Sequence, residues 1–454
     1  MLQRHHLFFR RLGLPALVVL AFVSFASASA TLLLEEPYGK LGFFTATGHA
    51  AVYLSGVCAE NPVRLRPCLP GETGVVLSRY DDVGGYDWIA IPLIPYLYAV
   101  ARPEDVPLFA DTKMVAFLRD RYRRKYLELV APDVNNGEAP GGNWYELVGS
   151  SYDRTIYGFQ IETTAEQDAA LIQKLNAASN RSHFRTVSSN CADFAKGIIN
   201  FYYPKALHRS VVADVGITTP KQMAKMLVKY NQRHPEIEYS RFIIAQVPGS
   251  MPRSSAVHGV VESFFKSKKY IVPSAIASPI FAGCVFAVYE GVGAGRFQPA
   301  KAALVLDPGG DLQQPIGHED LRSYQQELKD LLQTEYPTGA GQNVEKNWSH
   351  LQSHAITEFD DQGRLVLQVV ENGRVLRVGA SADNVLGDAA SSGLARELLE
   401  ARLQSELRSK ASHEISEPEV TRDWNLLEQM LAPNDSSLTA RTSQRPDNIH
   451  GNRP

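Results

Sequence analysis

Two side chains suited to nucleophilic catalysis lie far apart in this sequence, Cys191 and His49. A thiol enzyme needs a sulfur nucleophile and a base, and imidazole titrates closest to neutral pH. Cys191 follows Ser189 and Asn190, residue types that cap helices, which places it in the first turn of a helix. Backbone N–H groups there favour an anion, so we expect a lowered thiol pKa and donors for an oxyanion.

Each of these residues also has a purely structural interpretation. Cys191 shares a helix face with Ala195 and Ile198, and free cysteine is among the most buried residue types. His49 lies at the start of a strand-like run, residues 48–54, where a single histidine is more often structural than catalytic. Catalysis is favoured by the pair, a Gly-His strand followed much later by an Asn-Cys helix start.

The two segments carry a family resemblance. Residues 48–54, Gly-His-Ala-Ala-Val-Tyr-Leu, and 189–194, Ser-Asn-Cys-Ala-Asp-Phe, resemble the signature segments of circularly permuted NlpC-type papain-like proteins, which include lecithin:retinol acyltransferase relatives. Within this group, the chain is most similar to the Lnb N-terminal periplasmic domain family of bacterial envelope proteins, with support from residues 145–204. The resemblance covers about residues 35–230. It implies an α+β fold, an antiparallel sheet packed on helices, with Cys191 as nucleophile and His49 as general base.

A third polar residue orients the histidine in such sites, and in permuted members it comes from the next strand. The run 74–80 predicts that strand, on which Ser78 and Tyr80 are the candidates, with Glu72 just upstream. None of them matches the His, Asn or Glu pattern that the resemblance implies. Asn190 is a further candidate, because its amide could act at the site.

The first thirty residues have the layout of a secretory signal peptide. Basic residues precede an apolar run at 12–25, which Pro15 interrupts, and the small residues 26–30 follow. This run is short for a bilayer span of about twenty residues, so cleavage after Ala28 or Ala30 is favoured over an uncleaved anchor. We therefore expect an exported protein of the periplasm or cell envelope.

Export bears on the four cysteines, because disulfides persist outside the cytosol. Cys58 and Cys68 lie ten residues apart in a Pro-containing loop and are expected to pair, the alternative being two unpaired loop thiols. Cys191 and Cys284 then remain free.

The periodicity of apolar residues predicts the elements that position the site. An amphipathic helix is expected at 112–130, its basic face solvated, followed by a strand at 154–162 and by three helices. These three helices begin after Thr164, near Ser189 and after Thr219. Residues 88–100 are apolar, but two prolines argue against one regular helix.

The predicted organisation has five parts: a signal peptide (1–30), a papain-like catalytic domain (31–245), a linker (246–300) with an apolar segment (271–289), a smaller C-terminal α+β unit (301–410) and a disordered tail (411–454). The C-terminal unit is expected to hold helices at 319–336 and 392–410 around a hairpin region at 356–378 that turns at 360–363 and 371–373.

The apolar segment 271–289 carries no charge and follows three lysines. It approaches the length of a membrane span, and the protein could be anchored through it. Two prolines and many small residues equally suit a buried helix–loop in a core. Both interpretations stay open.

Composition narrows the function classes. A net charge of -3 and a pI near 6.5 argue against nucleic-acid binding, and no CxxC or HExxH pattern predicts a metal site or other cofactor. The first hypothesis is a hydrolase or acyltransferase that attacks an amide, ester or thioester through a Cys191 acyl-enzyme. Its substrate would be an envelope peptide or a lipid-linked group. The second is a non-catalytic envelope binding or assembly module on the same scaffold. No pattern in the sequence sets an oligomeric state.

Overall fold

The computed structural model describes residues 28–38, 47–107, 110–135, 137–181, 183–247, 249–291, 296–315, 317, 354–371 and 374–381. The expected helices at 319–336 and 392–410, the tail 411–454 and the signal peptide up to residue 27 lie outside the described residues.

The strands, in chain order, are β1 (Ser29–Glu35), β2 (His49–Leu54), β3 (Val57–Asn61), β4 (Arg64–Pro67), β5 (Val75–Ser78), β6 (Ile89–Pro92), β7 (Ile156–Glu162), β8 (Tyr239–Ile244), β9 (Leu304–Leu306), β10 (Leu312–Gln313), β11 (Ile356–Phe359), β12 (Leu365–Glu371) and β13 (Arg374–Gly379). The helices are α2 (Leu93–Tyr98), α3 (Thr112–Tyr126), α4 (Ser150–Asp153), α5 (Ala165–Ala177), α6 (Cys191–Tyr202), α7 (Val211–Asp214), α8 (Pro220–Arg233), α9 (Val260–Lys266), α10 (Lys268–Ala277) and α11 (Pro279–Gly291), with 3₁₀ turns η1 (Pro103–Asp105) and η2 (Trp144–Leu147).

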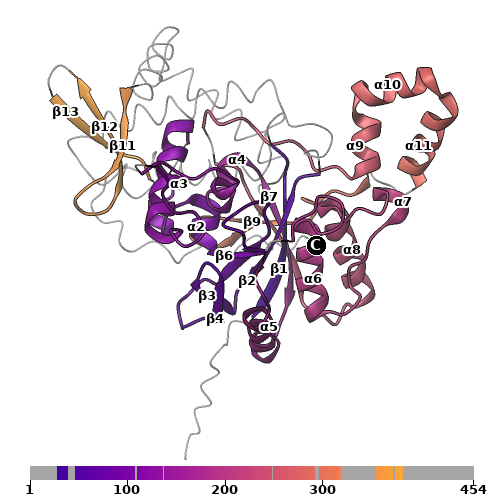
Figure 1. Cartoon of the computed structure of the whole chain (residues 1–454), viewed down its shortest axis with the longest axis horizontal. Coiled ribbons are helices and arrows are strands. Elements are labelled where there is room, and N and C mark those ends of the chain that lie inside the picture. Colours follow the sequence, from indigo (N-terminus) through magenta and orange to yellow (C-terminus); the bar gives the residue numbers. More distant parts are fainter. Residues whose placement is uncertain are drawn as a thin grey trace, which may run out of the picture.

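One large sheet organises the described part of the chain (Figure 1). Its strand order is β10-β9-β8-β7-β1-β2-β5-β6, and all neighbouring strands run antiparallel except β8 and β9. The strand β1 lies in the middle, paired along its length with β2 and β7. The expected α+β fold with an antiparallel-dominated sheet is therefore confirmed.

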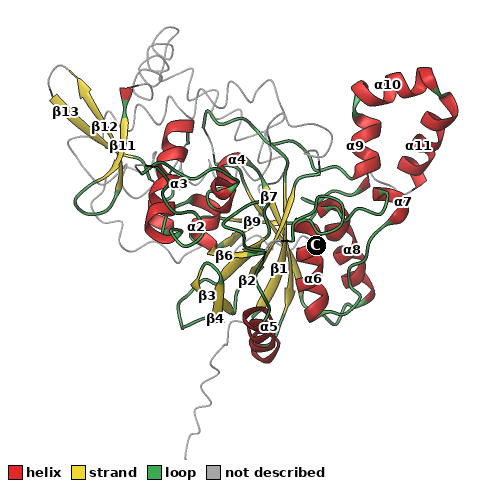
Figure 2. Cartoon of the chain, viewed as in Figure 1, coloured by secondary structure: helices red, strands yellow, loops and turns green. Residues whose placement is uncertain are grey.

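Alternating residues of the central strands enter two separate hydrophobic cores. On one face Leu33 and Ala51 pack with helices α2, α3 and α4. On the other face Leu34 and Ala50 pack with α5, α6 and α8. The sheet therefore lies between two groups of helices, as Figure 2 shows, and the second group includes the helix that starts at Cys191.

The helices around the site begin where local capping chemistry predicts. Thr164 caps α5, Asn190 caps α6 and Thr219 caps α8, each through a side-chain oxygen that accepts a backbone N–H three residues on. Pro220 is the first residue of α8, as expected. Residues 88–100 divide into β6 and α2.

The expected boundaries differ from the structure at two places. The central strand β1 begins at Ser29, inside the predicted signal peptide 1–30, and was not anticipated as a strand. The strands β9 and β10 follow residue 300 but extend the main sheet next to β8. The boundary expected at residue 300 therefore does not separate two sheets.

The basic face of α3 is not simply solvated. Arg119 is buried and donates to the carboxylate of Asp153, and Arg123 is fully buried against Asp120 and Asp133. These arginines fix the loops that follow α3, rather than forming an open cationic surface.

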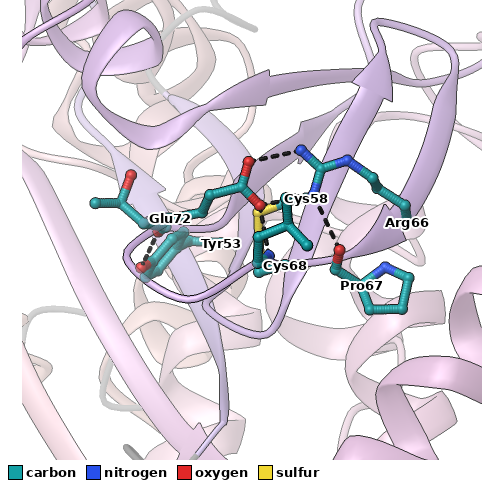
Figure 3. Close-up of a disulfide and its surroundings, with 8 residues drawn as sticks. Tyr53, Cys58, Arg66, Pro67, Cys68 and Glu72 are labelled. Carbon is teal, nitrogen blue, oxygen red and sulfur yellow. Dashed lines mark hydrogen bonds and ion pairs between the residues drawn. A yellow bond between two sulfur atoms is a disulfide. The ribbon is translucent and has the colours of Figure 1, made fainter.

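The disulfide between Cys58 and Cys68 is confirmed (Figure 3). Its Cα atoms lie 4.8 Å apart, and the β3–β4 hairpin brings the two cysteines together. Beside it Arg66 donates two hydrogen bonds of 2.6 Å to Glu72, which also accepts the Leu69 N–H. Glu72 therefore fastens the cysteine loop.

Two further parts of the structure are the three-stranded sheet of β11–β13 and the apolar segment 271–289. The strands β11, β12 and β13 form the predicted antiparallel hairpins. The apolar segment 271–289 is divided between α10 and α11, and neither helix has a buried residue. It is thus no core helix, and among the described helices none is both long and apolar enough to cross a bilayer.

Candidate active site

A cavity of about 400 Å³ opens where the start of β2 meets the start of α6. Four of the five predicted site residues line it: His49, Tyr80, Asn190 and Cys191. Ser78 does not line it, because it lies fully buried within β5. The fold thus brings together the strand histidine and the helix cysteine that are far apart in sequence.

Cys191 is the first residue of α6, and the cap of that helix determines its position. The Asn190 side-chain oxygen accepts the Asp193 N–H at 2.9 Å, while Asp193 accepts the Asn190 N–H. The Asn190 amide nitrogen donates to the carbonyls of Thr186 and Thr218, at 2.9 and 3.1 Å. Because both ends of this amide are engaged, Asn190 positions Cys191 and is not a free donor for substrate.

Cys191 is a partly exposed residue that lines the cavity. Burial nevertheless raises its pKa to about 11, against the smaller lowering effect of hydrogen bonds from the backbone of Ala50 and Ala192. The expected lowered pKa is therefore wrong for this structure. The helix start does act in the expected direction, but desolvation by the surrounding core outweighs it.

His49 is the first residue of β2 and is buried on the sheet face of Ala51. Burial lowers its pKa well below the usual range, and the charge of Arg154 lowers it further, so the imidazole is neutral at pH 7. Its Nε2 atom is buried without a hydrogen-bond partner among the described residues. A buried, unsatisfied imidazole nitrogen is destabilising by about 1–3 kcal/mol, and a catalytic role is one explanation for such a group.

Tyr80 holds the imidazole by stacking rather than by a hydrogen bond. The two rings are nearly parallel, at 6°, and their centroids lie 4.3 Å apart. Tyr80 follows β5, the strand that pairs with β2. The contact restricts the orientation of His49 without setting its tautomer.

A buried charge network lies behind the histidine and was not anticipated from the sequence. Glu35 is the cross-strand neighbour of His49 in β1 and is fully buried. It accepts a hydrogen bond from Tyr96 and faces Arg154 at 3.3 Å, and Arg154 also pairs with Glu146 at 3.1 Å. Burial raises the pKa of Glu35, although Arg154 and Tyr96 oppose the rise.

This network explains the electrostatics of the site. Burial is the main reason that the pKa of His49 is lowered, and the buried positive charge of Arg154 adds to the effect. Glu35 in turn disfavours a thiolate at Cys191. A buried carboxylate such as Glu35 could be identified from the sequence only by predicting the register of β1 against β2. No local motif marks a carboxylate at the end of an apolar run as part of a site.

One group of candidate metal ligands occurs among the described residues, away from the cavity. The ligand atoms of Cys58, Cys68 and Glu72 lie within 4.8 Å of one another. The two sulfurs are joined in the disulfide, so they offer no thiolate to a metal.

Comparison of the chain with known protein families, with curated proteins and with solved structures finds no match.

Proposed function

We propose that this chain is an exported thiol enzyme of the cell envelope, a hydrolase or acyltransferase that attacks an amide, ester or thioester. The observation that carries the proposal is the convergence of Cys191, at the start of α6, and His49, at the start of β2, on one cavity. The unpartnered, neutral imidazole nitrogen beside that cavity supports it further.

The reaction follows from the protonation states of the two side chains. Cys191 attacks the acyl carbon as His49 takes the thiol proton, so the nucleophile forms only when substrate is present. Backbone N–H groups at the start of α6 stabilise the oxyanion of the tetrahedral intermediate. His49 then returns the proton to the leaving amine, alcohol or thiol, and an acyl group remains on Cys191. Water or a second acceptor, deprotonated by His49, releases the acyl group and restores the thiol.

The fold supports a permuted papain-like assignment. A histidine strand precedes a cysteine helix, and that helix packs on an antiparallel-dominated sheet. We therefore retain membership of the NlpC-type group, and of the Lnb N-terminal periplasmic domain family within it, as part of the proposal. The disulfide between Cys58 and Cys68 is compatible with export.

A specific observation favours the second candidate, a non-catalytic envelope binding module. The thiol pKa is raised, and no hydrogen bond joins Cys191 to His49 among the described residues. A scaffold that had lost catalysis would retain both residues as cavity walls.

Acyl transfer to Cys191 separates the two candidates. The protein would be incubated with activated acyl thioesters and p-nitrophenyl esters, and the peptide that contains Cys191 would be analysed by mass spectrometry. We expect an acyl adduct on Cys191 that is absent in Cys191→Ala, and turnover reduced about 10²–10⁴-fold in His49→Gln. Cys284→Ser is the matched control, because it removes the other free thiol, which is exposed on α11. An adduct that forms only on Cys284, with turnover unaffected by His49→Gln, would leave the binding module as the better account.

A further inference from the structure

The segment Val260–Gly291, which we call the α9–α11 projection, extends away from the sheet (Figure 1). Phe265 of α9 stacks on Tyr289 of α11 with centroids 4.6 Å apart, and Phe264 contacts Phe281 near the far end. Helix α10 connects α9 and α11 there. The projection is thus held together by its own aromatic contacts.

The far end of the projection is apolar, and none of the described residues buries it. Four large apolar side chains are more than half exposed there or on α11, namely Val272, Ile276, Ile280 and Phe281, and Phe286 is 49% exposed. Ile276 and Ile280, at the junction of α10 and α11, are the most open of them, with exposed fractions of 79% and 82%. A helix that is apolar all round belongs in a core or a membrane, and no residue of α10 or α11 is buried.

The charged and aromatic residues at the start of α10 favour a lipid surface, rather than a protein, as the partner of this apolar end. Lys268 and Lys269 are exposed and make no ion pair with a described residue, and Tyr270 follows them directly. Lysines suit anionic headgroups, and tyrosine is enriched at the membrane–water boundary. Helix α11 is about 20 Å long. An immersion of about 5–10 Å, typical of interfacial helices, would therefore leave Tyr289 and Glu290 in water.

The projection is also fastened to the rim of the cavity. Val260, the first residue of α9, lines the cavity that holds Cys191. Glu262 is buried and pairs with Lys221 of α8 at 2.7 Å, while Asp214 accepts the Val260 N–H at 2.8 Å. Because α9 is only about 10 Å long, whatever the far end touches lies close to the cavity.

We propose that the far end of the α9–α11 projection docks into an anionic bilayer surface and so presents the cavity to acyl groups carried by lipids. The proposal of docking is supported by the exposed apolar side chains and by Lys268 and Lys269. The substrate class rests in addition on the proposed function.

Docking can be measured without catalysis, because Cys284 lies on α11 and is exposed. In Cys191→Ser it becomes the only free thiol and can carry an environment-sensitive bimane label. We expect the emission to shift to the blue on addition of phosphatidylglycerol/phosphatidylcholine vesicles. Ile276→Glu should weaken this binding about tenfold or more, because a charge replaces an inserted apolar group. Leu69→Glu, a matched exposed position on the disulfide loop, should leave it unchanged.

Other occupants of the surface give different results. A shift that needs no vesicles and grows with protein concentration would identify a second copy of the chain and overturn the proposal. An emission that is already blue without vesicles, and stays unchanged when they are added, would show that the chain covers the surface itself and would also overturn it. Replacement of both Lys268 and Lys269 by Glu should reduce binding to anionic vesicles most strongly at low salt.

The substrate class is tested with catalytically intact protein. One acyl group would be offered both on a lipid in vesicles and as a water-soluble ester. We expect Ile276→Glu to slow turnover of the vesicle form alone. Equal turnover of both forms would overturn the lipid substrate while the vesicle binding stands. No turnover of either form would overturn the proposed function, and the labelled protein would still decide the docking.

Discussion

The sharpest quantitative test concerns the protonation of Cys191 in the free protein. Burial raises its pKa to about 11, compared with about 8.5 for a free thiol. At pH 7 the thiolate fraction is then about 10⁻⁴, roughly 300-fold below that of free cysteine. The greater nucleophilicity of a more basic thiolate regains about 10- to 20-fold, for a Brønsted coefficient of about 0.4–0.5. Alkylation at pH 7 should therefore be about 20–30-fold slower than for free cysteine.

The labelling rate would be measured as a function of pH on the Cys284→Ser variant, in which Cys191 is the only free thiol. Pulsed iodoacetamide labelling, followed by mass spectrometry, should show a rate that rises about tenfold per pH unit from 7 to 10 without a plateau. His49→Gln should change this profile little, because the imidazole is already neutral. A midpoint below 8.5 that moves upward in His49→Gln would refute the reasoning, because it would reveal a preformed thiolate–imidazolium pair.

Further predictions concern stability and can be checked by urea unfolding. Because the folded pKa of Cys191 lies above the unfolded value, the folded state binds more protons between about pH 8.5 and 11, and ionisation of this thiol should lower stability as pH rises through that window. Asn190→Ala should lower the free energy of unfolding by about 0.5–2 kcal/mol through loss of the helix cap, and an unchanged value would contradict the capping role. Gly158→Ala should cost about 1–3 kcal/mol, because its Cβ would lie 2.3 Å from the ring of Phe242; a neutral result would mean that the ring moves freely. Replacing both Cys58 and Cys68 by Ser should cost about 3 kcal/mol on the chain-entropy model, and equal stability of the oxidised and reduced protein would exclude that contribution.

The sequence predicts those parts of the fold that local chemistry determines. Thr164, Asn190 and Thr219 cap helices because each needs only a backbone N–H three residues away. The disulfide between Cys58 and Cys68 was likewise predicted from their spacing in a Pro-containing loop, together with the expected export. The convergence of His49 and Cys191 on one cavity was expected only through the family resemblance.

Features that depend on distant packing were not predicted. The strand β1 follows directly on the apolar run of the expected signal peptide, so nothing in the sequence marks where the signal peptide would end and the strand begins. The network of Glu35 and Arg154 requires the register of β1, β2 and β7, which no motif encodes. The prediction of a lowered pKa for Cys191 was wrong. The effect of the helix terminus is local and can be predicted from the sequence, whereas the desolvation that raises the pKa comes from the whole core.

The central position of β1 has a consequence for folding during synthesis. β1 can pair early with β2, which follows it closely in the chain, but its other neighbour, β7, begins only at Ile156. Until then the Leu-rich edge of β1 is an open template for pairing with other chains. A nascent chain held at this stage would be aggregation-prone, and long-range pairing of this kind is slow. The interval between completion of β2 and arrival of β7 is thus the stage at which this protein most needs protection by a chaperone.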